Sequence, residues 1–427
     1  MSRRLAFVIV SLTATGACGA DAEPSSTALA TEVTEASRSP SPSSSPPSTR
    51  PNVSTTVESA VDPDGPIVID LAGAIAVNVT AAGERAALAW SADDAVWTAD
   101  VDTTSGTIGE PIAVNGDLLP FPNPIERPAV AIDARGRTHV AFTTLAGALG
   151  SVGYSVLDGG RVDGPVVVSG EPRIETVLVH MTESPAARPT MAWLEDSSLT
   201  VAVPDGDGPP VERDGIDDQT CDCCNPAPVL LGDELVVAYR DLERTDDAVI
   251  RDVVAIRSTD GGAVFSPIAP IADESWFIDA CPFSGPDMIE LDGELITSWM
   301  DARQSLHPDQ ESTTIWVDRS LDGGRSFGPD LAITEGGIHR WPMLAATDDG
   351  VIHLVWETQD RDAGGISYAR SADRGVSFDA PRLLLPNDER SGRRRAPSIA
   401  AAGDRLLVTW IDSTGGHLAS VDPSSLR

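Results

Sequence analysis

Short apolar runs separated by polar turns recur along the chain from about residue 66 to its end. In each repeat a proline precedes an apolar run, a Gly/Asp turn follows, and a second apolar run ends in an aromatic residue. An example is Pro342-Met343-Leu344, followed by Val355-Trp356. Short alternating runs without helical spacing predict β-strands. The aromatic that ends the second run recurs at Trp90, Phe142, Trp193, Tyr239, Trp299, Trp356 and Trp410.

The spacing of these aromatics indicates the fold. It is about fifty residues, the length that a β-propeller blade of four short strands needs. The sequence therefore predicts an all-β fold over residues 66–427: a six- or seven-bladed propeller of four-stranded antiparallel blades. A strand from the opposite terminus can complete such a ring, so the spacing leaves the number of blades open.

A second pattern, Ser-x-Asp-x-Gly-x-x-aromatic, occurs late in three repeats, at 258–265, 320–327 and 371–378. Its carboxylate can accept backbone N–H groups of its own turn, and its glycine supplies a positive-φ position. In this pattern and its blade spacing the chain resembles the sialidase-like, Asp-box (BNR-repeat) propellers. The resemblance implies that the Asp boxes are structural turns on the face away from any site.

The first 65 residues differ in composition from the repeats. Ser2-Arg3-Arg4, the apolar run 5–13 and the small residues before Cys18 resemble a bacterial lipoprotein signal, with Cys18 as the lipidated residue. Thr15 stands where that signal usually has leucine. Residues 19–65, rich in Ser, Thr and Pro, predict a disordered tether. The sequence thus predicts an extracytoplasmic protein, membrane-anchored through its N-terminal lipid or secreted.

Charge and composition exclude several function classes. The 427 residues carry a net charge of −35, and every basic residue is arginine. An acidic chain without a basic stripe is not expected to bind nucleic acid. The absence of lysine excludes Schiff-base chemistry on the chain.

In a propeller, residues before each repeat proline and after each repeat aromatic are expected to line one mouth. Any single charged residue there has the alternative of a solvated loop position or a local ion pair. The predicted binding residues are Arg127, Arg240, Arg340, Arg395 and Asp412. The catalytic candidates are Asp241, Asp301 and Tyr239.

The cysteines at 221–224 and 281 lie at nearly equivalent positions in consecutive repeats, so we expect them to be neighbours. Three interpretations of Cys221, Cys223, Cys224 and Cys281 stay open. An exported protein favours disulfides, soft thiolates suit copper(I) or zinc, and free thiols are the third. The Cys-x-Cys-Cys segment also resembles a group of uncharacterised exported sialidase-like bacterial proteins, which implies no chemistry.

The sialidase resemblance implies three substrate-binding arginines and a tyrosine nucleophile. Arg340 and Arg395 stand in Arg-x-Pro segments, and Arg127 directly precedes a proline, but late Arg-x-Pro segments depart from the family's order. Tyr239 occupies a repeat aromatic position, where packing is the alternative role. The first functional hypothesis is therefore a surface-anchored propeller that binds a glycan, an anion or a partner at an Arg/Asp/Cys-lined mouth. The alternatives are an exo-α-sialidase-type glycoside hydrolase and an extracytoplasmic thiolate metal-binding protein.

Overall fold

The computed structural model describes residues 67–147, 149–173, 177–182, 188–305, 312–360 and 363–426. These residues form β-strands, turns and a short 3-10 helix, η1 (Pro423–Leu426). The predicted signal segment, the predicted tether and Cys18 lie outside the described residues. Within the described ranges, no helix has the length and apolar character that a membrane span requires.

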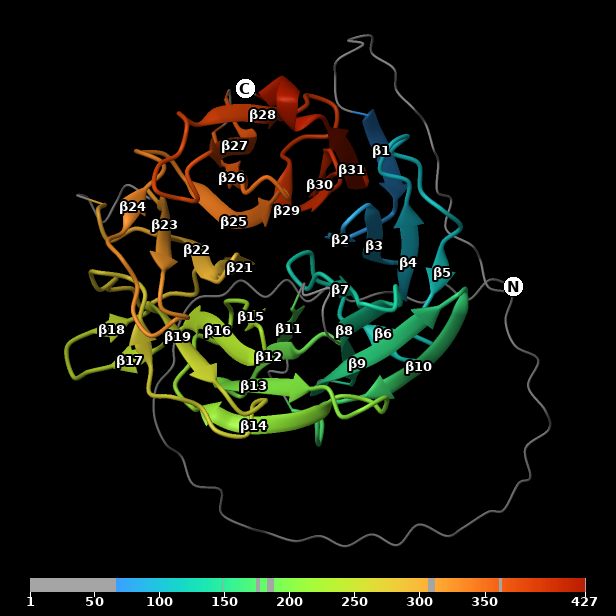
Figure 1. Cartoon of the computed structure of the whole chain (residues 1–427), viewed down its shortest axis with the longest axis horizontal. Helices are drawn as coiled ribbons and strands as arrows, with labels where there is room; N and C mark the ends of the chain where they lie inside the picture. The colour runs from blue at the N-terminus through green and yellow to red at the C-terminus, as the bar shows by residue number, and fades with distance from the viewer. Residues whose placement is uncertain are drawn as a thin grey trace, which may run out of the picture. The chain divides into compact units, whose positions relative to one another are not determined.

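The strands form seven blades around a centre (Figure 1). Blade 1 consists of β2 (Ala76–Ala82), β3 (Arg85–Ala92), β4 (Ala95–Val101) and β5 (Ile112–Ala113). Blade 2 consists of β7 (Ala129–Ile132), β8 (Thr138–Ala146), β9 (Leu149–Asp158) and β10 (Arg161–Val167), with β6 (Leu119–Pro120) also paired to β8. Blade 3 consists of β11 (Val177–Met181), β12 (Met191–Glu195), β13 (Ser198–Val203) and β14 (Val211–Asp217).

The next three blades repeat this order. Blade 4 consists of β15 (Ala227–Leu231), β16 (Glu234–Arg240), β19 (Val253–Ser258) and β20 (Ala269–Pro270), with an inserted hairpin of β17 (Glu243–Arg244) and β18 (Val249–Ile250). Blade 5 consists of β21 (Asp287–Leu291), β22 (Glu294–Asp301), β23 (Thr314–Ser320) and β24 (Leu331–Ala332). Blade 6 consists of β25 (His339–Ala346), β26 (Ile352–Thr358), β27 (Gly365–Ser371) and β28 (Arg382–Pro386).

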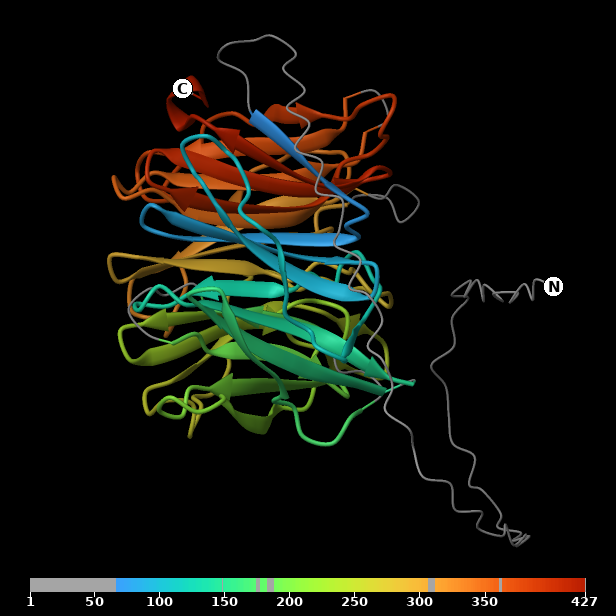
Figure 2. The ribbon, with the colours of Figure 1, turned by 90° about the vertical axis from the view of Figure 1, so that its right-hand side faces the viewer.

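Blade 7 joins the two ends of the repeat region. It consists of β29 (Arg395–Ala402), β30 (Arg405–Asp412), β31 (Gly415–Val421) and, as its outermost strand, β1 (Ile67–Ala72). β1 pairs antiparallel with β31, with Val68 opposite Ala419 and Leu71 opposite Gly416. Figures 1 and 2 show the blue β1 beside the red strands of this blade. The borrowed strand confirms the expected mode of closure and gives seven blades.

The repeat aromatics have the role that their spacing predicts. All seven lie on the second strand of a blade and are almost fully buried. They fill the space between neighbouring sheets, where large apolar side chains contribute most to stability. The aromatic spacing therefore reports the packing between blades.

The Asp boxes follow the third strands β19, β23 and β27. In the second box Asp322 Oδ1 accepts the backbone N–H groups of Arg325 and Ser326 at 3.0 and 2.9 Å, and Gly324 adopts φ 77°. The hydroxyl of Ser326, together with these N–H groups, lowers the pKa of Asp322 to about 2. Because third strands run away from the end where first strands begin, the boxes lie on the far face of the propeller.

The first strands of the blades form a closed ring of neighbours: β2, β7, β11, β15, β21, β25 and β29. They surround a central cavity of about 240 Å³. We call the end at which these strands begin the mouth. The segments that reach it include the loops 221–225 and 281–286 and the first residues of β25 and β29, 340–341 and 395–396.

Closure by β1 predicts a large effect of a small substitution. Leu71 is 1% exposed, and Leu71→Ala is expected to lower the free energy of unfolding by about 3 kcal/mol, through lost burial and a residual cavity. The matched control Leu321→Ala, at a position 67% exposed, should change it by less than about 0.5 kcal/mol. Denaturant unfolding of the full chain measures both. Equal effects would contradict a stabilising role for β1.

Candidate functional site

Two loops bring the cysteines together at the mouth. One loop carries Cys221, Cys223 and Cys224 into β15, and the other carries Cys281 into β21 of the next blade. Asn225 and Gly285 hold the loops together: Asn225 Oδ1 accepts the Gly285 N–H at 3.3 Å. A Cβ on Gly285 would lie 2.0 Å from the Asn225 carbonyl oxygen, so this close approach requires glycine.

Three of the sulfurs form a compact buried group, which we call the cysteine trio. The Sγ of Cys221 lies 2.9 Å from that of Cys224 and 3.5 Å from that of Cys223. The Sγ atoms of Cys223 and Cys224 are 3.9 Å apart. Cys281 is exposed, and its sulfur lies within 4.8 Å of both the Cys223 sulfur and a carboxylate oxygen of Asp222. All four described cysteines are free thiols in this structure.

Two buried guanidinium groups flank the cysteine trio. Arg251 Nη1 donates to the Cys221 sulfur at 3.0 Å. Arg240 donates to the carbonyl oxygens of Arg251 and Met300, each at 2.8 Å, and its guanidinium lies 5.1 Å from the centre of the Trp276 ring. Among the described residues, neither arginine forms an ion pair with a carboxylate. Buried cations of this kind favour negative charge on the sulfurs.

The surroundings separate the proton affinities of the thiols. Hydrogen bonds from the Cys223 and Cys224 thiols, then the charges of Arg240 and Arg251, lower the pKa of Cys221. The hydrogen bonds that Cys223 makes to its neighbours raise its pKa, and burial raises that of Cys224. Within the trio, the surroundings therefore favour the thiolate form at Cys221.

The donor set of the trio suits a soft metal ion. Three sulfurs around one ion, at bonds of about 2.3 Å, stand about 4 Å apart. The observed separations of 2.9 to 3.9 Å approach that spacing, with Cys221 and Cys224 the pair that must open. Thiolates bind copper(I) and zinc in preference to calcium or magnesium. Bound there, such an ion would be held by Cys221, Cys223 and Cys224.

The predicted binding arginines lie around the mouth, and Arg127 and Arg340 donate to backbone carbonyls there. Arg127 spans the mouth end of the cavity and donates to Pro397 O at 2.5 Å and to Met343 Sδ at 3.5 Å. Burial lowers its pKa to about 10. Arg340 donates to Pro282 O, beside Cys281, at 3.1 Å. Arg395 lies one residue before Ala396, which lines the same small mouth cavity as Arg127 and Cys223.

Of the catalytic candidates, Asp241 lies beside the cysteine trio and Tyr239 points elsewhere. Asp241 pairs through its backbone with Thr220, the residue before Cys221, and burial raises its pKa to about 6. Tyr239 is fully buried, and its hydroxyl donates to Asp217 Oδ2 at 2.5 Å. Burial and this hydrogen bond raise the pKa of Tyr239. Its packing role is explained by these contacts, whereas a catalytic role stays a prediction.

The Asp301 and Asp412 side chains bind groups within their own blades. Asp301, 2% exposed, accepts the indole N–H groups of Trp299 and Trp316 at 3.0 and 2.9 Å. Burial raises its pKa. Asp412 contacts His417 at 2.9 Å and accepts the Thr414 N–H at 2.8 Å. An acid two residues after a strand aromatic shares its face of the sheet, so Asp301 lies against the indole and not in the mouth cavity.

Sequence reasoning missed Arg251, Asp222 as a carboxylate near Cys281, and Trp341. A signal for Arg251 existed: the interval from Tyr239 to Trp299 is the longest between repeat aromatics. The extra length is the β17–β18 hairpin, and Arg251 directly follows it. Nothing in the repeat pattern indicates Trp341, whose indole N–H donates to Phe283 O at 2.5 Å between the adjacent blades 5 and 6.

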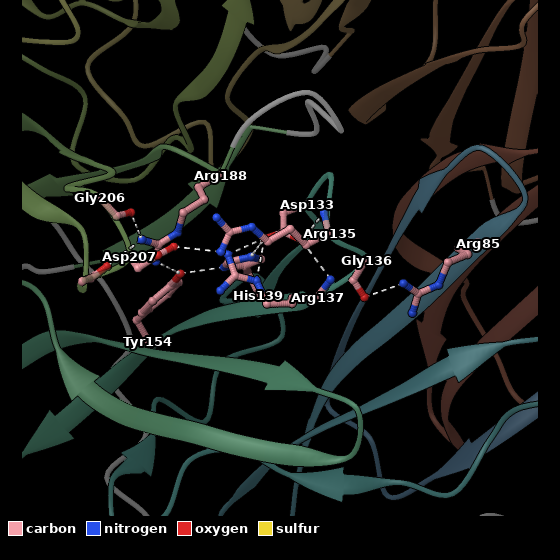
Figure 3. Close-up of polar contacts among 11 residues, drawn as sticks. Arg85, Asp133, Arg135, Gly136, Arg137, His139, Tyr154, Arg188, Gly206 and Asp207 are labelled. Carbon is pink, nitrogen blue, oxygen red and sulfur yellow. Dashed lines mark hydrogen bonds and ion pairs between the residues drawn. The ribbon is translucent and has the colours of Figure 1, made fainter.

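A second polar network surrounds the turn between β7 and β8, at the end of blade 2 away from the mouth. Figure 3 shows its side chains. His139 Nδ1 and the Tyr154 hydroxyl are 2.6 Å apart, and His139 Nε2 lies 3.1 Å from Asp133 Oδ2. Arg188 approaches Tyr154 from blade 3 and donates to the Gly206 and Gly208 carbonyls. This network, buried around His139 and more exposed at Arg188, joins blades 2 and 3.

The far-face network predicts a pH dependence of stability. Burial lowers the pKa of His139 to about 4. The Asp133 carboxylate opposes this shift because it favours the charged imidazolium, and the positive charges of Arg137 and Arg188 add to the shift. Unfolded histidine titrates near 6.5, so between about 6.5 and 4 the unfolded chain binds a proton that the folded chain lacks. The contribution of His139 to the free energy of unfolding is fully present above about pH 6.5. It decreases as the pH falls toward 4, by at most about 3 kcal/mol.

The check is unfolding of the wild type and His139→Gln between pH 4 and 8. The variant should lose less stability on acidification. His353→Gln should behave alike, because burial lowers the pKa of His353 to about 4 and its Nδ1 lies 2.8 Å from the Tyr368 hydroxyl. A wild-type-to-variant difference that is constant with pH would contradict the assignment.

Comparison with known proteins bears on the fold. An ulvan lyase from a new polysaccharide lyase family, PL25, is 12% identical, with 82% of this chain and 95% of that chain covered and a TM-score of 0.53. The chain folds as a seven-bladed β-propeller of four-stranded antiparallel blades. A Dyadobacter fermentans protein of unknown function is 16% identical over 82% of this chain and 93% of that one, at TM-score 0.47. The Hadza microbial sialidase Hz136 is 14% identical over 78% and 75%, at TM-score 0.47.

At 12% identity, the likeness to the ulvan lyase supports the fold alone. No protein-family model matches the sequence, and no curated protein does. The chemistry of the mouth must therefore be argued from its own residues.

Proposed function

We propose that this chain is an extracytoplasmic propeller that binds a soft metal ion, copper(I) or zinc, at the cysteine trio of its mouth. The observation that carries the proposal is the convergence of three buried sulfurs at 2.9 to 3.9 Å. The buried guanidiniums of Arg251, which donates to the Cys221 sulfur, and of Arg240 add to it, because both favour negative charge on the sulfurs.

The experiment is thiol titration with metal analysis of the full chain purified without oxygen. We expect bound copper or zinc, and thiols that become reactive when the metal is chelated. Cys221→Ser should lose the metal. Cys18→Ser, which removes a cysteine outside the trio, is the matched control and should keep it. Fully oxidised cysteines without co-purifying metal would favour the disulfide interpretation and reject the proposal.

A second candidate function is the binding of a glycan or another anion at the same mouth, with sialidase-type hydrolysis as its catalytic form. It is favoured by two Arg-x-Pro segments with the same local geometry. Trp341 and Ala396 both adopt positive φ, 50° and 49°, within equivalent β-bulges, so Arg340 and Arg395 occupy matching places on blades 6 and 7. Paired guanidiniums suit a carboxylate ligand.

Turnover of a fluorogenic sialoside and glycan-array binding test this second candidate. Activity lost in Arg340→Ala and in Arg395→Ala would support it. Arg325→Ala, an exposed arginine of an Asp box on the far face, is the control. Absence of both turnover over a wide pH range and glycan binding would reject this second candidate and leave the metal proposal standing.

Anchoring through Cys18 is a further part of the proposed function. Its support is the sequence alone: a short basic and apolar segment followed by small residues and a cysteine. In cells, Cys18→Ser should release the protein from the membrane fraction and abolish incorporation of a labelled fatty acid. Unchanged membrane association of the variant would reject lipidation at this residue.

A further inference from the structure

The four mouth cysteines do not form one four-thiolate site. The donor atoms form two groups, and within each group all atoms lie within 4.8 Å of one another. One group is the trio Cys221, Cys223 and Cys224, and the other is Asp222, Cys223 and Cys281. Cys223 belongs to both. A tetrahedral zinc site would hold four ligand sulfurs at nearly equal separations of about 4 Å. The geometry therefore divides into two positions that share one sulfur.

Burial gives the two positions different access to solvent. Cys221 and Cys224 are 0% and 1% exposed, Cys223 is 8% exposed, and Cys281 is exposed. Asp222, in the second group, is half-buried. The donors thus form a graded series from the surface to the interior, with Cys223 in the middle.

Charge distinguishes the interior position further. Three thiolates and one copper(I) ion carry two negative charges, and the buried guanidiniums of Arg240 and Arg251 lie close enough to stabilise them. The nearby carboxylate of Asp301 also acts on Arg240, so Arg251, which contacts Cys221, is the cation that belongs to the trio alone. Soft thiolate donors in a buried group of three suit copper(I). The outer group adds the Asp222 carboxylate, which attracts a cation at the surface.

We infer that Cys281 and Asp222 form an exchange port, through which copper(I) passes by way of Cys223 to the buried cysteine trio. This inference rests on the proposed metal-binding function. Copper(I) first binds between the sulfurs of Cys281 and Cys223. The Cys221 thiolate then forms a bond to copper as the bond to Cys281 breaks, and Cys224 joins. Thiol protons pass to water, Cys281 recovers one, and copper stays in the +1 state throughout.

The experiment follows transfer of copper(I) from its bicinchoninate complex to the reduced full chain without oxygen, by the absorbance of the complex. Wild type is expected to take one copper per chain. Cys281→Ser should also take one, but more slowly by about tenfold or more, because the outer thiolate is missing. X-ray absorption should report three sulfur ligands in both proteins.

Two further variants separate the port from the buried site. Asp222→Asn should slow loading, whereas Asp218→Asn, an exposed carboxylate outside both groups, should load at the wild-type rate. Cys221→Ser should fail to retain copper. Near-UV circular dichroism checks that each variant is folded.

Three outcomes overturn the inference. Loss of copper from Cys281→Ser at equilibrium would make Cys281 a permanent ligand. Loading of Cys281→Ser at the wild-type rate would remove the port while leaving the proposed function intact. Absence of copper binding by the wild type would reject the proposed function and the port together.

Discussion

The full chain loaded with copper(I) will unfold at a higher temperature than the metal-free chain, and Cys224→Ser will abolish that difference. A ligand that binds only the folded state adds about 4 kcal/mol when its free concentration is 1,000 times its dissociation constant. For a domain of this size the melting temperature should rise on the order of 5 °C. Scanning calorimetry with bicinchoninate-buffered copper(I) measures the shift.

Cys224 is the informative position because it is buried and its sulfur lies 2.9 Å from that of Cys221. A serine there can lower the stability of the metal-free chain, so the compared quantity is the shift on loading. Cys18→Ser should show the full wild-type shift. A Cys224→Ser variant that is stabilised as much as wild type would contradict binding at the cysteine trio.

Asp301→Ala will lower the free energy of unfolding by about 4 kcal/mol while leaving metal content unchanged. The substitution leaves two buried indole N–H groups, of Trp299 and Trp316, without an acceptor. It also removes a carboxylate 3.4 Å from the Arg303 guanidinium, which keeps its pairing with Asp330. Chemical denaturation followed by tryptophan fluorescence measures the loss.

The control for Asp301 is Asp348→Ala, at an exposed turn position, which should change stability by less than about 0.5 kcal/mol. Asp301→Asn keeps one acceptor oxygen and should fall between the two. If Asp301→Ala is as stable as the control but loses an activity at the mouth, Asp301 is a catalytic residue and not a packing partner.

Much of the fold could be predicted from local patterns. The aromatic of each second strand must fill the space between sheets in every blade, so it recurs at Trp90 and six later positions. The Asp boxes carry their own hydrogen bonds, as Asp322 does with Arg325 and Ser326, so their structure is local. The number of blades was not local, because it depends on β1 pairing with β31 across the whole chain.

The acids that follow the aromatics illustrate the limit of reasoning by position. Asp301 lies at the end of a second strand, as a mouth residue should, yet its side chain is on the face of Trp299. Strand alternation implies this, because residues two apart share a face. Only the neighbouring strand, which brings Trp316 to the same carboxylate, shows that both oxygens are used.

For the candidate site, the sequence by itself determined that Cys221, Cys223, Cys224 and Cys281 belong to equivalent loops of adjacent blades. The tertiary structure decided how they divide: a buried trio, and an outer group in which Cys281 joins Cys223 and Asp222. It also decided that Arg251, carried by an inserted hairpin, contacts Cys221. The physical reason is that repeat spacing encodes which strands stack. Side-chain distances in loops depend instead on individual contacts, such as that of Asn225 with Gly285, which the repeat spacing of the sequence does not predict.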